Sequence, residues 1–128
     1  MATPVSHPDV HVFDAPYSAA LRIGNLLFVS GTVAVDENGE LVGRGDLVAQ
    51  TRQALLNIRK LLEAAGAGFD DVGQLTYYVA DISQWAAVSA VRREILAEPY
   101  PAGTAVEVSR LVNSGWLIEI EAIAVLPG

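Results

Sequence analysis

Three glutamates, Glu107, Glu119 and Glu121, interrupt otherwise apolar stretches near the C-terminus. Apolar and polar residues alternate with period two on both sides of residues 113–115. This pattern predicts two adjacent strands between Tyr100 and Val125, joined by an Asn-Ser-Gly turn. A carboxylate on an apolar strand must be paired, hydrogen-bonded or functional, because burying a bare charge is expensive. We therefore expect the chemistry of this protein to lie in this region.

Other residue types that support catalysis or metal binding form weaker patterns. Cysteine is absent, which excludes a disulfide framework, a thiolate zinc site and a thiol nucleophile. His7 and His11 lack a third ligand at a recognisable spacing, and no Ser-His-Asp arrangement can be argued from them. Gly43 and Gly45 do not form a phosphate-binding fingerprint. We predict no metal site.

Composition limits the class of protein. A length of 128 residues with 52% hydrophobic residues predicts a single domain over residues 1–128 with one core. The formal net charge of −7 repels polyanions, so we expect no nucleic-acid partner. Residues 1–9 are expected to form an extended lead-in without the features of a signal peptide. No apolar run approaches membrane-spanning length, and these features together predict a cytoplasmic protein with no membrane partner.

Periodicity and turn residues predict the remaining elements. A Gly24-Asn25 turn is expected to precede a buried strand. Asp46 and Ser83 are placed to cap two helices. The first helix should bury its apolar stripe and expose Gln50, Asn57 and its charged residues. The predicted strands span residues 26–30, 32–35 and 72–79, and the predicted helices span residues 47–65 and 83–97.

This order of elements predicts an α+β domain of two layers, in which two helices cover one face of a mixed sheet. The other face would carry Glu107 or Glu119 beside Leu117, Ile123 and Val125. Such a face is too apolar to be fully wet. We expect it to be covered by other copies of the chain in a closed symmetric oligomer.

Spaced segments over nearly the whole chain, from about residue 16 to the end, resemble the RidA family, also called YjgF or L-PSP. The segments are Pro16-Tyr17-Ser18, Gly24-Asn25-Leu26, Phe28-Val29-Ser30-Gly31, Gln50-Thr51-Arg52-Gln53, Leu56-Asn57, Ala64-Ala65-Gly66, Asp81, Tyr100-Pro101-Ala102, Val106-Glu107-Val108 and Ile118-Glu119-Ile120-Glu121-Ala122-Ile123-Ala124.

The resemblance implies a chorismate-mutase-like (RidA-type) fold and a homotrimer with three clefts between subunits. It also implies hydrolysis of reactive enamines and imines to 2-oxo acids and ammonia, without a cofactor or metal. In that scheme Glu119 holds and activates a water for attack on the imine carbon. Tyr17, Ser30 and Gly31 would line the cleft.

The chain departs from the family pattern at the residue that binds the substrate carboxylate. The family has an arginine directly after the Pro-Ala pair, and this chain has Gly103. Ala105 replaces a common cysteine, and Ser89 replaces a common asparagine on the second helix. Losing the guanidinium removes an interaction worth roughly 1.5–3 kcal/mol. We expect the pocket around Gly103, Thr104 and Ala105 to suit a different or larger ligand.

Two arginines on the second helix are candidates to replace the missing cation. Arg92 and Arg93 follow Ser89 by three and four residues, which places them on the same side of the helix. If Ser89 faces the cleft, one of them would bind substrate there. The alternative is an ordinary solvated helix face.

Two functions follow from these observations. The first is a RidA-like hydrolase or deaminase of an imine, enamine or related small metabolite in clefts between subunits. The alternative is a non-catalytic small-molecule-binding or chaperone-like trimer that uses the same clefts. Endoribonuclease activity, attributed to some family members, is disfavoured by the acidic balance and by the lack of a nucleophile–base pair.

Overall fold

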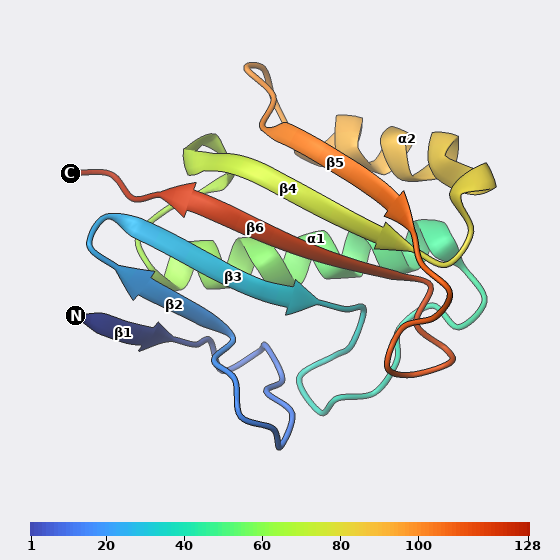
Figure 1. Cartoon of the computed structure of the whole chain (residues 1–128), viewed down its shortest axis with the longest axis horizontal. Helices are drawn as coiled ribbons and strands as arrows, with labels where there is room; N and C mark the ends of the chain where they lie inside the picture. The colour runs from blue at the N-terminus through green and yellow to red at the C-terminus, as the bar shows by residue number, and fades with distance from the viewer.

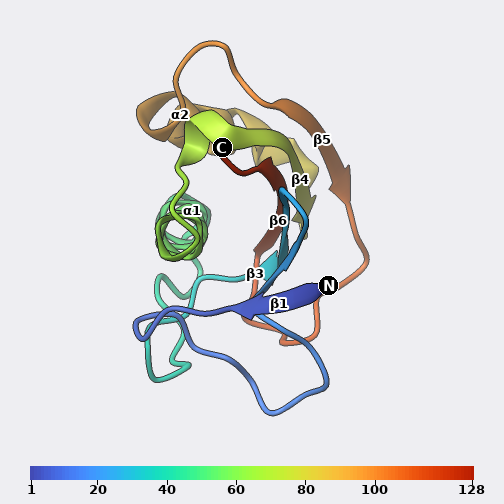
Figure 2. The ribbon, with the colours of Figure 1, turned by 90° about the vertical axis from the view of Figure 1, so that its left-hand side faces the viewer.

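The chain forms one mixed six-stranded sheet with two helices on a single face, and the computed structural model describes all of residues 1–128 (Figures 1 and 2). The predicted α+β two-layer fold is confirmed. Neither helix combines the length and apolar character needed to cross a membrane. The elements are β1 (Ala2–Val5), β2 (Ala20–Ile23), β3 (Leu26–Thr32), α1 (Leu47–Ala64), β4 (Val72–Val79), α2 (Trp85–Ile95), β5 (Ala102–Glu107) and β6 (Ile118–Val125).

The sheet order is β1-β2-β3-β6-β4-β5, so the last strand of the chain lies near the centre of the sheet. β6 pairs antiparallel with both β3 and β4. The only parallel pair is β4 with β5, and α2 is the crossover helix that such a pair requires. The expected two-residue turn at Gly24-Asn25 joins β2 to β3, and Gly24 has the positive φ of +61° that a tight hairpin demands.

The prediction that residues 100–125 form two adjacent strands is wrong. β4 lies between β5 and β6, and the connection of residues 108–117 carries the chain past the end of β4. The predicted turn exists, because Gly115 N–H donates to Asn113 Oδ1 at 2.9 Å, but it lies inside this long connection. β6 has the apolar residues that a central strand needs, whereas most of β5 is exposed at the sheet edge.

Two other strand predictions also need correction. The N-terminal segment is not only a lead-in, since residues 2–5 form the edge strand β1 against β2. Pro4 is tolerated there because an edge strand has one row of N–H groups that needs no partner. The separate strand expected at residues 32–35 is absent: β3 continues to Thr32, and beyond it Val35 forms a single bridge with Leu41.

The pleat of β6 divides its side chains between the two faces of the sheet. Ile118, Ile120 and the alanines at 122 and 124 are buried under the helices. Glu119 and Glu121, together with Ile123 and Val125, occupy the opposite face, which we call the open face. Of the two glutamates considered for this face, Glu119 lies on it, whereas the Glu107 carboxylate accepts a hydrogen bond from Ile82 N–H. The expectation that Leu117 lies on this face is wrong, because Leu117 packs against the core.

Helix α1 supplies the other half of the core. Asp46 caps it as predicted, with its Oδ1 accepting from Ala49 N–H at 3.0 Å. Leu55, Ile58 and Leu62 are fully buried against the sheet. Residue 65 is its C-cap and is followed by Gly66, close to the predicted end.

Gln50 and Asn57 were predicted to face solvent, but both are buried, with exposures of 0% and 1%. Their side-chain amides hydrogen-bond to backbone groups of loops. Gln50 donates to the carbonyls of Gly43 and Gly115, at 3.1 and 3.0 Å, and accepts from Leu117 N–H at 2.9 Å. Buried carbonyl and N–H groups must find partners, and this requirement does not appear in an apolar pattern.

Helix α2 is shorter than predicted. A 3₁₀ turn at Ile82–Gln84 precedes it, and Asp81 caps this turn, because its Oδ1 accepts from Ser83 N–H at 3.0 Å. The N-cap of α2 itself is Gln84, without a side-chain capping hydrogen bond, so the prediction that Ser83 caps the helix is wrong. The helix ends at Ile95, before the prolines at 99 and 101. Helix α2 lies directly behind the edge strand β5 (Figure 1).

We predict that Gln50→Leu lowers the free energy of unfolding by at least about 1–3 kcal/mol, the cost of one unsatisfied buried polar group. The substitution keeps the volume and leaves Gly115 O and Leu117 N–H without a partner, whereas Gly43 O still accepts from Asp46 N–H. Urea unfolding at fixed protein concentration measures the change. Gln84→Leu, at an exposed position, is the control and should change stability by less than about 0.5 kcal/mol. Equal stability of the two variants would contradict this role of Gln50.

Candidate functional site

Glu119 lies on the open face of β6, where its carboxylate packs against the backbone of Gly31. A Cβ atom at Gly31 would collide with Glu119 Oε2, so the absence of a side chain at 31 makes this contact possible. A bulge between Val29 and Thr32 interrupts the pairing of β3 with β6 at this point. Bulges commonly redirect side chains next to functional sites.

The two carboxylates of β6 differ in their partners. Glu121 accepts a short hydrogen bond from Tyr78 O–H on the neighbouring strand β4. Glu119 is half-buried and receives no hydrogen bond from the chain. It also takes no part in the two ion pairs of the structure, Arg52–Glu94 and Arg59–Glu63. Burial raises the pKa of Glu119 above its ordinary value, and the negative charge of Glu121 raises it further. An unpartnered carboxylate with a raised pKa is suited to accept a proton near neutral pH.

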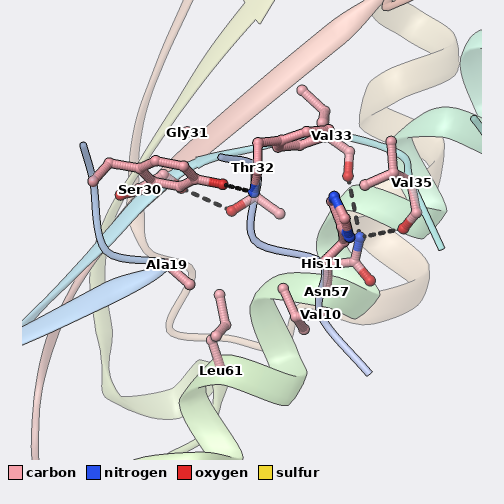
Figure 3. Close-up of a pocket in the computed structure, with 12 residues that line it drawn as sticks. Val10, His11, Ala19, Ser30, Gly31, Thr32, Val33, Val35, Asn57 and Leu61 are labelled. Atoms are coloured by element: carbon pink, nitrogen blue, oxygen red, sulfur yellow. Dashed lines mark hydrogen bonds between the residues drawn. The ribbon is translucent and has the colours of Figure 1, made fainter. Parts of the chain in front are cut away.

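Tyr17, Ser30 and Gly31 line a cavity of about 30 Å³ at the end of β3, between the residue 10–19 loop and α1 (Figure 3). Tyr17 Oη accepts from Phe13 N–H at 2.8 Å, and Ser30 Oγ donates to Ser18 O. The cavity has room for about one water molecule. Glu119 is not part of its lining, but Gly31 both lines the cavity and contacts the Glu119 carboxylate. We call Tyr17, Ser30, Gly31 and Glu119 the Glu119 cluster.

The second set of predicted residues lies at the edge of the sheet, between β5 and α2. Arg92 Nε donates to Tyr77 Oη at 3.0 Å, and Arg92 Nη1 lies 3.4 Å from Ser89 Oγ. The guanidinium carbon is 4.8 Å from the ring centroid of Tyr77 and 5.2 Å from that of Trp85. Gly103 of β5 lies beside this guanidinium, since a Cβ atom placed there would lie 3.3 Å from Arg92 Nη2. We call Ser89, Arg92 and Gly103 the Arg92 cluster.

The remaining predicted residues differ in position. Ala105 is on the helix side of β5 and packs against the core. Thr104 is exposed on the opposite side, in register with Thr76. Arg93 is exposed and borders a cavity of about 140 Å³ together with Arg92 and Ser89.

Within one chain the Glu119 cluster and the Arg92 cluster do not meet. Glu119 belongs to the open face, whereas Arg92 approaches Gly103 from the helix side of the sheet. A single site that contains both clusters therefore requires a second copy of the chain.

The aromatic residues that hold Arg92 were not predicted from the sequence as part of the site. Tyr77 is buried, and burial raises the pKa of its hydroxyl, while the nearby Arg92 acts in the opposite direction. Its alternation with neighbouring residues indicates only a strand. Trp85 precedes Arg92 by seven residues, two helical turns, so helical spacing alone would place both on one face of α2.

The fold and the site define a small α+β domain with an unpaired carboxylate and no metal-ligating cluster of three or more residues. The family model described as Endoribonuclease L-PSP matches residues 11–126, and the chain belongs to this family, the RidA/YjgF/L-PSP family.

Individual relatives agree with this assignment. The chain is 39% identical to a 2-iminobutanoate/2-iminopropanoate deaminase of Capra hircus, over 86% of this chain and 80% of that protein. It is 37% identical to the 3-aminoacrylate deaminase RutC of Acinetobacter baylyi, over 86% of each chain. The crystal structure of RidA from an Antarctic Psychrobacter species superposes with a TM-score of 0.90 at 33% identity, covering 97% of this chain and 99% of that one.

We predict that the Glu119 carboxyl titrates above the ordinary glutamate value of about 4.3. Carbon-detected NMR of the side-chain carboxyls measures the inflection. Glu121→Gln should lower it, because one negative charge is removed, but should leave it above the ordinary value, because burial is the larger cause. Glu63→Gln, on the exposed side of α1, should leave it unchanged. An inflection at or below the ordinary value would contradict this description of the site.

Proposed function

We propose that the protein is a deaminase that hydrolyses a reactive imine or enamine of a small 2-oxo acid. One observation carries the proposal: Glu119 is half-buried, lacks a partner in its own chain and has a raised pKa. Relatives named as imine and aminoacrylate deaminases support the choice of substrate class.

The proposed reaction uses water and the Glu119 carboxylate. Glu119 accepts a proton from the water while the water oxygen attacks the imine carbon. The electron pair of the carbon–nitrogen double bond moves to nitrogen, which takes up a proton from solvent to give a carbinolamine. Glu119 returns its proton to this nitrogen, the carbon–nitrogen bond breaks, and ammonia leaves as the hydroxyl loses its proton to solvent and the carbonyl forms. An enamine first gains a proton at carbon and loses one from nitrogen to reach the same imine. The raised pKa favours this role, since general bases work best with a pKa near the working pH.

The proposed active form is a homotrimer with a cleft between each pair of subunits. The open face carries a set of large apolar side chains that are more than a third exposed, which is typical of an interface. The set is Ile23, Leu26, Phe28, Val106, Ile123 and Val125. A cyclic arrangement would place the Glu119 cluster of one copy beside the Arg92 cluster of the next, which would complete the site.

Binding without turnover is the second candidate function. Gly103 favours it, because the arginine that binds the substrate carboxylate in the family pattern is absent at this position. A trimer of this kind would hold a small metabolite in the same clefts without hydrolysing it.

We propose no nucleic-acid substrate, although the family description names an endoribonuclease. Arg52, Arg59 and Lys60 of α1 form the local basic patch that the sequence offers for RNA. Arg52 pairs with Glu94 at 2.9 Å, and Arg59 lies 3.9 Å from Glu63. Two of its three cations are thus next to carboxylates, which weakens attraction to phosphate.

We predict that Glu119→Gln lowers kcat/KM by about 10²–10⁴, the usual contribution of a general base. The assay follows release of 2-oxo acid from 2-aminoacrylate or 2-iminobutanoate generated in place by a pyridoxal-phosphate enzyme. The wild-type rate should fall as pH drops through the raised pKa, because protonation removes the base. Glu63→Gln is the control and should keep full activity. If the wild type does not accelerate release, the deaminase proposal fails and binding without turnover is favoured.

We predict that Ile123→Glu breaks the assembly into smaller species, because it places a charge in the centre of the open face. Sedimentation velocity should give three times the mass of one chain for the wild type and less for the variant. Val48→Glu is a matched control, since Val48 is 37% exposed and Ile123 39%, but Val48 lies on α1 away from the open face. A monomeric wild type, or an intact Ile123→Glu trimer, would overturn the proposed assembly.

A further inference from the structure

Arg92 differs from the other arginines in its surroundings. Five of the seven arginines are exposed, and only Arg52 and Arg92 are partly buried. Arg52 pairs with the Glu94 carboxylate, whereas no carboxylate lies within ion-pair distance of Arg92. Removing a guanidinium from water without a counter-ion is unfavourable. In a chain with fifteen acidic residues, this isolation of a cation indicates that an anion comes from outside the chain.

The guanidinium is held in one orientation and keeps donors free. Tyr77 and Trp85 provide two aromatic faces for the cation, and Tyr77 Oη accepts from Nε. With Ser89 Oγ near Nη1, two of the five N–H groups have partners in the chain. Three N–H groups remain, including both on Nη2. Arg92 lines the cavity of about 140 Å³ together with Ser89 and Tyr100, which gives a small ligand access to its side chain.

Gly103 explains how the guanidinium reaches the edge strand. Its φ is not positive, so the backbone conformation does not demand glycine there. The space favours glycine, because a Cβ atom would lie 3.3 Å from Arg92 Nη2, a tight contact that the guanidinium could relieve only by shifting a few tenths of an ångström. Position 103 is also where the family pattern has its carboxylate-binding arginine. The cation from α2 thus lies beside the backbone position from which the family's arginine would project.

We propose that Arg92 binds the ligand carboxylate in place of the missing strand arginine, and that Gly103 is the space that admits it. The inference rests on the proposed function, because it places Arg92 in the same cleft as Glu119 of a neighbouring copy. The ligand class is a small 2-imino or 2-oxo acid, bound through its carboxylate by the free Nη groups. Planar guanidinium groups suit this bidentate contact.

A purely structural arginine would behave differently in one respect. Its loss would reduce stability without distinguishing a charged ligand from a neutral one. A carboxylate-binding arginine discriminates between an acid and its ester. The decisive measurement is therefore this discrimination rather than activity alone.

The test measures dissociation constants of pyruvate and 2-oxobutanoate, and of their methyl esters, by NMR titration of the assembled protein. Arg92→Ala should weaken binding of both acids about tenfold to hundredfold and leave the esters unchanged. Arg92→Lys should give an intermediate loss, because it keeps the charge without the planar fork. Arg59→Ala, on α1, removes the same charge elsewhere and should have no effect. Thermal melting confirms that each variant is folded.

A swap provides the second arm of the test. Arg92→Ala combined with Gly103→Arg returns a guanidinium to the strand and should recover acid binding, and with it KM. Unchanged acid binding in folded Arg92→Ala, or a wild type that does not prefer acids to esters, would overturn the inference. Failure of the proposed function looks different: the wild type would bind the acids through Arg92 and show no turnover of imine.

Discussion

The position of β6 between β3 and β4 is the constraint on which the rest of the structure depends. Hydrogen bonds on both edges and helices on one face leave this strand a single acceptable register. A slip of one residue would turn Glu119 and Glu121 under α1 and expose Ile118 and Ile120. Burying two carboxylates would cost far more than any contact there could return. The energetics of the core therefore fix where the candidate base lies, although Glu119 contributes nothing to the core.

The two carboxylates of β6 show how neighbouring like charges can take different roles. They lie two residues apart on the same face, and the negative charge of Glu121 disfavours ionisation of Glu119. Glu121 accepts a hydrogen bond from Tyr78 O–H, and this bond is the main cause of the raised pKa of Tyr78. Glu119 receives no hydrogen bond, contacts the backbone position of Gly31 and has a raised pKa. The two carboxylates are chemically identical, and they differ only in their surroundings and hydrogen-bond partners.

Much of the fold could be predicted from the sequence, because helix caps and period-two alternation are local. Asp46, the Gly24-Asn25 turn and the apolar stripe of α1 all lie where local rules place them. Strand order could not be predicted in this way, since alternation shows that β5 and β6 are strands but not which neighbour each pairs with. The burial of Gln50 could not be predicted either. It follows from backbone groups near residues 43 and 115, which the fold brings together from distant parts of the chain.

The candidate site shows the same division between local and long-range information. The spacing of Ser89 and Arg92 correctly predicts their proximity, whereas the contact of Arg92 with Gly103 depends on the crossover that places α2 behind β5. A side chain at 103 and the guanidinium of Arg92 compete for one volume, so the two positions can be understood only together. On its own, glycine after the Pro-Ala pair indicates a lost carboxylate-binding residue. Paired with Arg92, it indicates a cation supplied from the helix, so the loss of a motif residue does not establish the loss of the interaction it provided.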